Sequence, residues 1–166
     1  MADDRAVFEQ LVDLHGASVL AFLRRLCGRD QDADDVFQDV ALRVWKNLGS
    51  RPRLRNPRGW MMTIAYRAFL DHRARMPRLV PLQEGDAIPS QEARQRDPSA
   101  IAQQVELESL VQDCLSDLPW PIRSVVALHY AGGLSIHEVA RTLGIPPGTA
   151  KSRLNSALEQ LRRRLS

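Results

Sequence analysis

The chain has 166 residues, of which 44% are hydrophobic and 26% charged, and its formal net charge is +3. This is the composition of a soluble globular protein, and no uninterrupted apolar run approaches the roughly 20 residues that cross a membrane. The start, Met1 to Arg5, has the pattern of neither a signal nor a transit peptide, so we expect a cytoplasmic protein without membrane insertion. Cys27 and Cys114 lie far apart in apolar helical patterns, which favours two buried free thiols over a disulfide or a metal pair.

Charge alternates along the chain in blocks. Residues 1–42 carry four basic and nine acidic side chains, whereas residues 43–75 carry nine basic and one acidic side chain. The pattern repeats, with four against nine in residues 77–138 and six against one in residues 139–166. Two basic blocks, each preceded by an acidic one, indicate two contacts with a polyanion and two surfaces suited to other partners.

Two helices are predicted in the first 48 residues. The first ends at Gly28, and the second begins in the acidic segment DQDADDVFQDV (residues 30–40) with Asp32 as its N-cap. Asp34 and Asp35 suit the first turn because negative charge is favourable at a helix N-terminus. The apolar residues of the second helix recur at three- and four-residue spacing, and the buried set is expected to be Val36, Phe37, Val40, Ala41, Val44, Trp45 and Leu48.

Two kinds of chemical site fit the acidic segment poorly. A calcium loop fails because Asp35 stands where glycine is needed and Ala41 stands where the bidentate glutamate is needed. A catalytic pair of carboxylates would need a cleft that separates their pKa values, and the neighbouring sequence builds none. A helix start explains the first aspartates but not the exposed Gln38 and Asp39.

A basic loop, residues 49–56, precedes the third predicted helix. Asn56 is its expected N-cap and Pro57 its first residue, and the helix ends near Arg75. Its periodicity predicts that Trp60, Met61, Ile64, Ala65 and Ala68 are buried, and that Arg58, Thr63, Arg67, Leu70 and Arg73 face another side. Residues 77–99 contain four prolines and little periodicity, which is typical of a linker, and fully extended they reach roughly 75 Å.

The end of the chain predicts a helix-turn-helix. A helix is expected from Asp97 and Pro98 to the LPWP segment at residues 118–121, and another from there to the glycine pair at residues 132–133. Ser135 and Glu138 then form a capping box, and Gly144 permits the sharp turn before the last helix. That helix begins with exposed polar residues suited to phosphates and base edges, which favours DNA binding over a plain helical hairpin.

The sequence lacks residues that two enzymatic alternatives would need. His137 and Glu138 begin an HExxH zinc-protease pattern, but Arg141 stands at the second ligand position. A nucleic-acid enzyme is disfavoured because the basic block 43–75 has Asp71 as its one carboxylate, whereas metal-dependent phosphoryl chemistry usually needs several. We therefore expect no catalysis, no metal and no cofactor.

Three segments in order resemble the bacterial RNA polymerase sigma factors of the extracytoplasmic-function group. DADDVFQDVALRVW (32–45) is similar to the polymerase-binding helix of region 2, and GWMMTIAYRAFLDHRAR (59–75) to the helix after the promoter-reading loop. LSIHEVARTLGIPPGTAKSRL (134–154) is similar to region 4. The resemblance implies a transcription initiation factor that binds core RNA polymerase and promoter DNA, and an anti-sigma factor of unknown identity as a further partner.

The resemblance also assigns three sets of residues. Polymerase contacts fall on Asp35, Gln38, Asp39 and Arg43, with Phe37 and Trp45 in the core. The minus-10 contacts fall on Arg53, Arg55, Asn56, Arg58 and Arg67, of which Arg67 stands where the family usually has asparagine. The minus-35 contacts fall on Thr149, Lys151, Ser152, Arg153 and Asn155.

The sequence as a whole predicts an all-α protein with two small helical domains. Residues 1–76 are expected to form region 2, a helical bundle, and residues 77–99 a flexible linker. Residues 100–166 are expected to form region 4, the helix-turn-helix. The alternative function is a helix-turn-helix transcriptional regulator that does not bind polymerase as a sigma subunit; it explains the C-terminal half equally well but gives no reason for the acidic face of the second helix.

Overall fold

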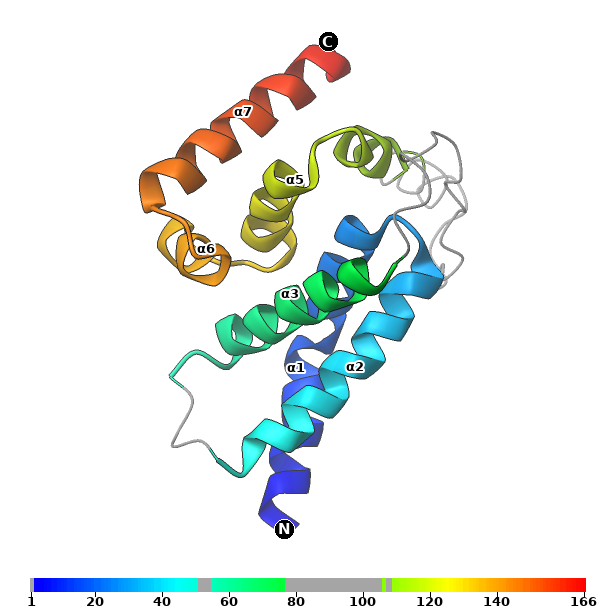
Figure 1. Cartoon of the computed structure of the whole chain (residues 1–166), viewed down its shortest axis with the longest axis vertical. Helices are drawn as coiled ribbons and strands as arrows, with labels where there is room; N and C mark the ends of the chain where they lie inside the picture. Colours follow the sequence, from blue (N-terminus) through cyan, green and yellow to red (C-terminus); the bar gives the residue numbers. More distant parts are fainter. Residues whose placement is uncertain (1, 51–54, 77–105, 107–108) are drawn as a thin grey trace, which may run out of the picture.

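All regular structure in the described part of the chain is helical. The computed structural model describes residues 2–50, 55–76, 106 and 109–166. Its helices, from the N-terminus to the C-terminus, are α1 (Ala2–Cys27), α2 (Asp30–Leu48), α3 (Pro57–Arg75), α5 (Trp120–Val126), the π-helix η1 (Ala127–Ala131), α6 (Ile136–Leu143) and α7 (Pro147–Leu165). Residues 109–116 are also helical. We refer to residues 2–76 as the N-terminal unit and to residues 109–166 as the C-terminal unit; Figure 1 shows them stacked, with the two chain ends at opposite ends of the molecule.

The ends of the first three helices follow local chemistry. Gly28 has a φ of 74°, the left-handed conformation that stops α1 where the sequence predicted. The side chain of Asn56 accepts a hydrogen bond from the Gly59 amide, which confirms it as the N-cap of α3. The expected N-cap of α2 was wrong, because the helix begins at Asp30 after Arg29 and has no side-chain cap. Asp30 and Asp32 nevertheless lie in the first turn, where their charge is favourable.

Packing of α2 follows a narrower stripe than its apolar pattern predicts. The residues that it buries most are Ala33, Val36, Val40 and Val44, at three- and four-residue spacing. Trp45, expected in the core, is 46% exposed, because it lies one position beyond this stripe. Phe37 is half-buried and packs against the core. The error came from counting every apolar residue of the helix as inward-facing.

α3 is more buried than expected because it has neighbours on two sides. It contacts α1 and α2 of its own unit and α6 of the C-terminal unit. Besides the predicted Met61, Ala65 and Ala68, it therefore buries three further residues, Met62, Tyr66 and Phe69. The side of α3 that the sequence assigned to another partner is thus partly covered within the chain itself.

The helix-turn-helix has the predicted start and turn. The Ser135 hydroxyl accepts from the Glu138 amide, and the Glu138 carboxylate accepts from the Ser135 amide at 2.8 Å, so the capping box is complete. Gly144 ends α6 with a φ of 65°. α7 then packs against α5 and α6. The helix expected up to the glycine pair is also present, but its last turn is the π-helix η1.

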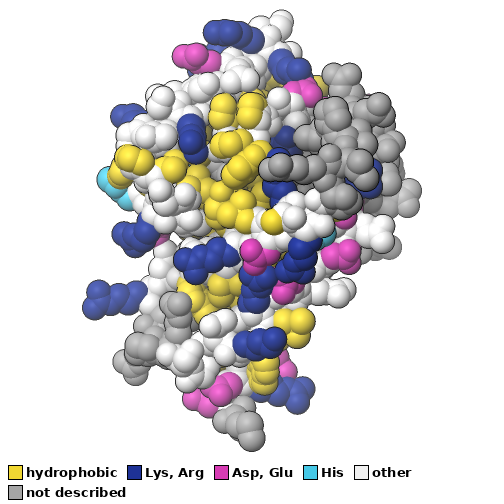
Figure 2. All heavy atoms as spheres, viewed as in Figure 1, with side chains coloured by type: hydrophobic (Ala, Val, Ile, Leu, Met, Phe, Trp, Pro, Cys, Tyr) yellow, Lys and Arg dark blue, Asp and Glu magenta, His cyan; other side chains and the backbone are white. Residues whose placement is uncertain are grey.

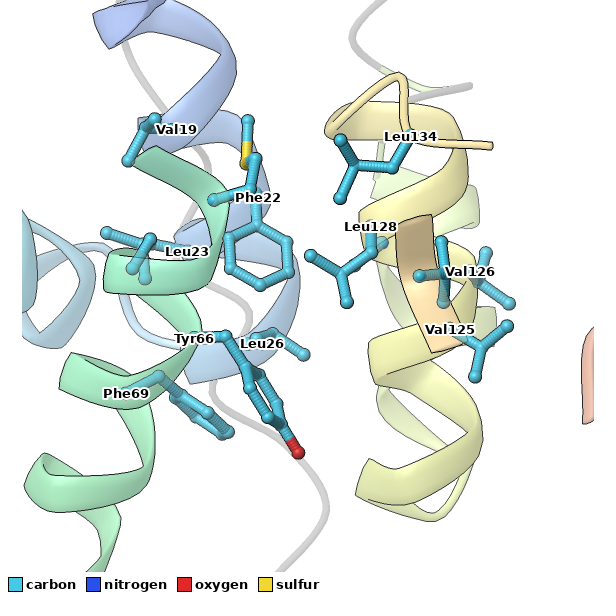
Figure 3. Close-up of a cluster of buried hydrophobic side chains, with 14 of the residues drawn as sticks. Val19, Phe22, Leu23, Leu26, Tyr66, Phe69, Val125, Val126, Leu128 and Leu134 are labelled. Carbon is cyan, nitrogen blue, oxygen red and sulfur yellow. The ribbon is translucent and has the colours of Figure 1, made fainter. Parts of the chain in front are cut away.

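The two units share one continuous apolar core, which the two-domain prediction did not anticipate. α1 contacts α5 and η1 across the boundary. Figure 3 shows α1 residues such as Phe22 and Leu26, with Tyr66 of α3, facing Leu128 and its neighbours in the C-terminal unit. The predicted linker, residues 77–99, lies outside the described residues, so the domain boundaries stay a prediction.

α1 is long and apolar enough to cross a membrane when judged by length and composition alone. This differs from the expectation that no apolar stretch reaches such a length. The helix instead buries Leu11, Val19, Phe22, Leu23 and Leu26 in the protein core. Its apolar character is therefore explained by packing against neighbours on more than one side.

Candidate nucleic-acid and protein interfaces

α2 presents its acidic and amide residues on an accessible face. Asp35 and Gln38 are exposed, and the Asp39 side chain is 37% exposed. Arg43 forms ion pairs of 2.8 Å with both Asp39 and Asp71, which ties α2 to α3. Burial alone would lower the pKa of Arg43, but its hydrogen bonds and Coulomb attraction to the two carboxylates outweigh this and raise the pKa. The structure thus places all four predicted polymerase contacts on one helix, with the charge of Arg43 compensated by two aspartates.

An apolar groove adjoins this face and was missed in the sequence. It is lined by Phe8, Gln38, Ala41, Leu42 and Trp45. Leu42 is 59% exposed, and the Trp45 ring meets Phe8 edge-on at a centroid distance of 5.5 Å. The signal was available: the stripe Val36–Val40–Val44 already fills the inward face of α2, which leaves Leu42 and Trp45 turned away from the core.

The predicted minus-10 residues separate into two places. Arg55, Asn56 and Arg58 lie together at the start of α3, whereas Arg67 lies further along the helix beside Arg43, Asn47 and Ile64. Arg55 and Arg67 are exposed and Arg58 is half-buried. Arg53 lies outside the described residues.

Contacts across the two units involve the start of α3. The Asn56 side chain donates a hydrogen bond to Glu138, the capping-box carboxylate of α6. Arg58 donates to Ser18 at 3.4 Å and to the Ala131 carbonyl at 3.3 Å. Hydrogen bonds from the Ser135 backbone and side chain and from Asn56, with the nearby charge of Arg141, hold the pKa of Glu138 below its ordinary value. Sequence reasoning gave Glu138 the capping role alone, because a contact over 82 residues leaves no local pattern.

The start of α7 exposes the polar residues expected of a recognition helix. Lys151, Ser152 and Asn155 are exposed, while Thr149 and Arg153 are half-buried. Ala150, Leu154 and Ala157 form the opposite, buried side of this helix. The charge of Arg153 acts on Tyr66 of α3, although burial dominates and raises the pKa of that phenol. In Figure 2, Lys and Arg side chains gather across the middle of one face of the molecule and alternate there with Asp and Glu.

Metal-binding and redox chemistry have little support in this geometry. Within residues 2–50, 55–76 and 109–166, no three His, Cys, Asp or Glu side chains come together as metal ligands would. Cys27 and Cys114 are free thiols, and burial raises the pKa of Cys27 to about 12. The described structure thus combines a helix-turn-helix whose last helix exposes polar residues with a separate face of α2 that carries acidic and apolar side chains.

Comparison with known proteins gives the family. The family pattern of sigma-70 region 2 matches residues 11–78, and that of sigma-70 region 4 matches residues 108–161. The ECF RNA polymerase sigma factor SigL of Mycobacterium tuberculosis is 31% identical over 166 residues, covering 97% of this chain and 90% of SigL. The ferric citrate uptake sigma factor FecI of Escherichia coli is 30% identical, covering 92% of this chain and 87% of FecI.

The chain therefore belongs to the extracytoplasmic-function (ECF) sigma factors of RNA polymerase, and it is a transcription initiation factor that directs the polymerase to promoters. Two solved structures have the same fold. The sigma factor RpoE bound to the anti-sigma factor NepR, from Bartonella quintana, has a TM-score of 0.77 at 24% identity, covering 95% of this chain and 96% of RpoE. CnrH bound to the cytosolic domain of CnrY has a TM-score of 0.67 at 24% identity, covering 97% of this chain and 88% of CnrH.

Proposed function

We propose that this sigma factor divides its three contacts among three helices. Core RNA polymerase is bound by the face of α2 that carries Asp35, Gln38, Asp39 and Arg43, extended by the groove at Trp45. The minus-10 element is read by the loop before α3 and by the start of that helix, with Arg67 as a further contact. The minus-35 element is read in the major groove by the first two turns of α7, from Thr149 to Asn155.

The observation that carries this proposal is the opposite character of the two accessible faces. The α2 face combines carboxylates with exposed apolar side chains, which suits a basic, partly apolar protein surface and repels DNA. The start of α7 offers Lys151, Ser152 and Asn155 to solvent, which suits phosphates and base edges. A plain helix-turn-helix regulator would need the second face and not the first.

The remaining features of the function are proposals of the same kind. The chain performs no catalysis of its own, because its task is to bind the polymerase and position promoter DNA. It acts in the cytoplasm, where polymerase and DNA are found. An anti-sigma factor is a further partner, since the fold is shared with two sigma factors whose structures contain one, RpoE with NepR and CnrH with CnrY.

Reversing one charge on α2 tests the polymerase contact. We expect Asp39→Arg to weaken binding to core polymerase by roughly ten-fold or more, because it places a cation against a basic partner and frees Arg43 from one of its two aspartates. Asp34→Arg is the matched control, since it makes the same charge change at an exposed position of the same helix outside the proposed contact. Fluorescence anisotropy of the labelled chain with core enzyme measures both affinities, and circular dichroism checks the fold.

Equal affinity of Asp39→Arg and the unchanged chain for core enzyme would contradict the proposed contact. Transcription from a genomic library by core polymerase and this chain, with start sites mapped, tests the wider function. A regulator that does not act as a sigma subunit would produce no new start sites in that reaction.

A further inference from the structure

Asp71 is the one carboxylate of the basic block 43–75, and it is bound to α2 rather than to its own helix. Its side chain forms an ion pair of 2.8 Å with Nη1 of Arg43. Nη2 of Arg43 forms a second ion pair of 2.8 Å with Asp39, one turn earlier on α2. Two carboxylates therefore hold the guanidinium of Arg43, one from α2 and one from α3.

Asp71 has another candidate partner on its own helix. Arg67 precedes it by four residues in α3, a spacing at which opposite charges on one helix face can pair. Within the described part of the chain, however, Asp71 pairs with Arg43, and Arg67 is exposed and forms no ion pair. The carboxylate of α3 thus serves the α2 face, and it leaves Arg67 available for its proposed contact with promoter DNA.

Arg43 keeps donors for a partner although it is paired twice. A guanidinium carries several N–H donors in a fixed planar fork, and two ion pairs do not use all of them. The Arg43 side chain is 28% exposed, against 37% for Asp39 and 54% for Asp71, so a partner can still reach it from solvent. The two ion pairs therefore restrain Arg43 without enclosing it.

Restraining Arg43 in the free protein favours its binding to a partner. An arginine side chain that is ordered only on binding loses rotamer freedom at that moment, and this entropy loss lowers the affinity. Asp39 alone would restrain Arg43 weakly, because exposed ion pairs four residues apart on one helix contribute little. Asp71 adds an anchor from a second helix, and a planar guanidinium held by two carboxylates keeps one orientation. Part of the ordering is then complete before the partner binds.

We propose that Asp71 is a positioning residue for the polymerase contact and that it acts through Arg43. Together with Asp39, it holds the guanidinium so that the remaining donors of Arg43 meet an acceptor oxygen on the polymerase. The inference rests on the proposed function, which places Arg43 in that contact. It extends the polymerase-binding machinery to α3, a helix that the sequence assigned to promoter DNA.

Removing the charge of Asp71 tests this role. Asp71→Asn keeps the shape of the side chain but breaks the ion pair with Arg43. We expect it to weaken binding of the full-length chain to core polymerase, without DNA, by about three- to ten-fold, as when one more side chain must be ordered on binding. Asp71→Glu keeps the charge and should restore most of the affinity. Asp34→Asn makes the same charge change at an exposed position of α2 outside the proposed contact, so it is the matched control.

A double-mutant cycle distinguishes positioning from direct contact. Arg43→Met keeps the apolar stem and removes the cation, so it should weaken binding by itself. If Asp71 acts through Arg43, adding Asp71→Asn to Arg43→Met should cause no further loss of affinity in the same anisotropy measurement. A further loss as large as the one in the unchanged chain would mean that Asp71 contacts the polymerase directly, and would overturn the positioning role.

Unfolding in urea separates positioning from a purely structural role. Because exposed ion pairs contribute little to folding, Asp71→Asn should leave the unfolding midpoint nearly unchanged while the affinity falls. A loss of affinity that is matched by a loss of stability would overturn the inference. Unchanged affinity of Asp71→Asn, with Asp39→Arg binding weakly, would overturn it too but leave the proposed contact standing. Unchanged affinity of both variants would contradict the proposed polymerase contact itself.

Discussion

Asn56 and Glu138 each have a local role that the sequence predicts and a distant one that it does not. Asn56 caps α3, and Glu138 completes the capping box of α6. Across the two units, the side-chain nitrogen of Asn56 also donates a hydrogen bond to the carboxylate of Glu138. The same side chains thus define helix starts and join the units, so a substitution at either position changes both a helix start and the contact between the units.

Lys151 allows base reading to be distinguished from phosphate binding at a single residue. It is exposed near the start of α7, in the second turn, and recognition helices contact base edges with their N-terminal residues. We expect Lys151→Ala to weaken binding at the preferred minus-35 sequence by about 1 to 3 kcal/mol and to relax preference at one base position. Selection from a randomised minus-35 library, with holoenzyme made from each protein, measures both effects.

Arg162→Ala is the matched control for Lys151→Ala. Arg162 is exposed about three turns further along α7, beyond the expected depth of the groove, so its loss should leave the preferred sequence unchanged. If Lys151→Ala keeps the preferred sequence and lowers all affinities alike, with a salt slope smaller by about one, Lys151 binds phosphate. Specificity must then come from Thr149, Ser152, Arg153 or Asn155.

At the scale of elements, glycine and the capping box fix the geometry of the helix-turn-helix. The left-handed residue Gly144 turns the chain between α6 and α7, and the capping box sets where α6 begins. The π-helix η1 ends the preceding helix and leaves the Ala131 carbonyl to Arg58. Short-range signals thus determine the shape of the helix-turn-helix. The end of η1 supplies a contact between the C-terminal and N-terminal units.

Two glycine substitutions should have opposite effects on stability. Gly144→Ala should lower the free energy of unfolding by about 1 kcal/mol, because its φ of 65° is unfavourable for a residue with a Cβ, although the space around it is open. Gly148→Ala should raise it by about 0.5 to 1 kcal/mol, because Gly148 is helical and its Cβ would also meet nothing. Urea unfolding followed by circular dichroism measures both, and destabilisation of the same size at both sites would refute the conformational explanation.

At the scale of the whole molecule, a buried cation and a shared core join the two units. Arg123, only 6% exposed, donates to the carbonyls of Ser116 and Leu118 in its own unit and of Leu26 in α1. Its burial, together with the charge of Arg73, lowers its pKa. Arg73 also lies over the Trp120 ring, 5.1 Å from its centroid. The two units are therefore joined by a hydrogen bond from Arg123 and by the contact of Arg73 with Trp120, as well as by apolar packing.

The shared core predicts that the free protein unfolds as one cooperative body. Two variants that each keep a single tryptophan report on the two units separately. One variant keeps Trp60 in α3 and the other keeps Trp120 in α5, and phenylalanine replaces the other two tryptophans in each. We expect the two fluorescence transitions in urea to coincide with each other and with the helical signal. Midpoints that differ between the probes, with unchanged overall stability, would show that each unit folds alone and that the contact between the units is weak.

The sequence by itself determined those features whose causes lie within a few residues. Helix ends at Gly28, Asn56 and Gly144, the capping box at Ser135, and the polar start of α7 all follow from local backbone and hydrogen-bond chemistry. The order of three motifs along the chain also determined the family, because such an order is far more specific than any single helix.

The tertiary structure decided which apolar and polar side chains meet. Periodicity alone could not tell that Tyr66 and Phe69 are buried, because this depends on which neighbouring helices cover each face of α3. Nor could it bring Asn56 to Glu138 or Arg58 to Ala131, since these pairs are 82 and 73 residues apart. Contacts at such separations form only when distant segments fold together, and their free energy comes from the shared core rather than from any local pattern.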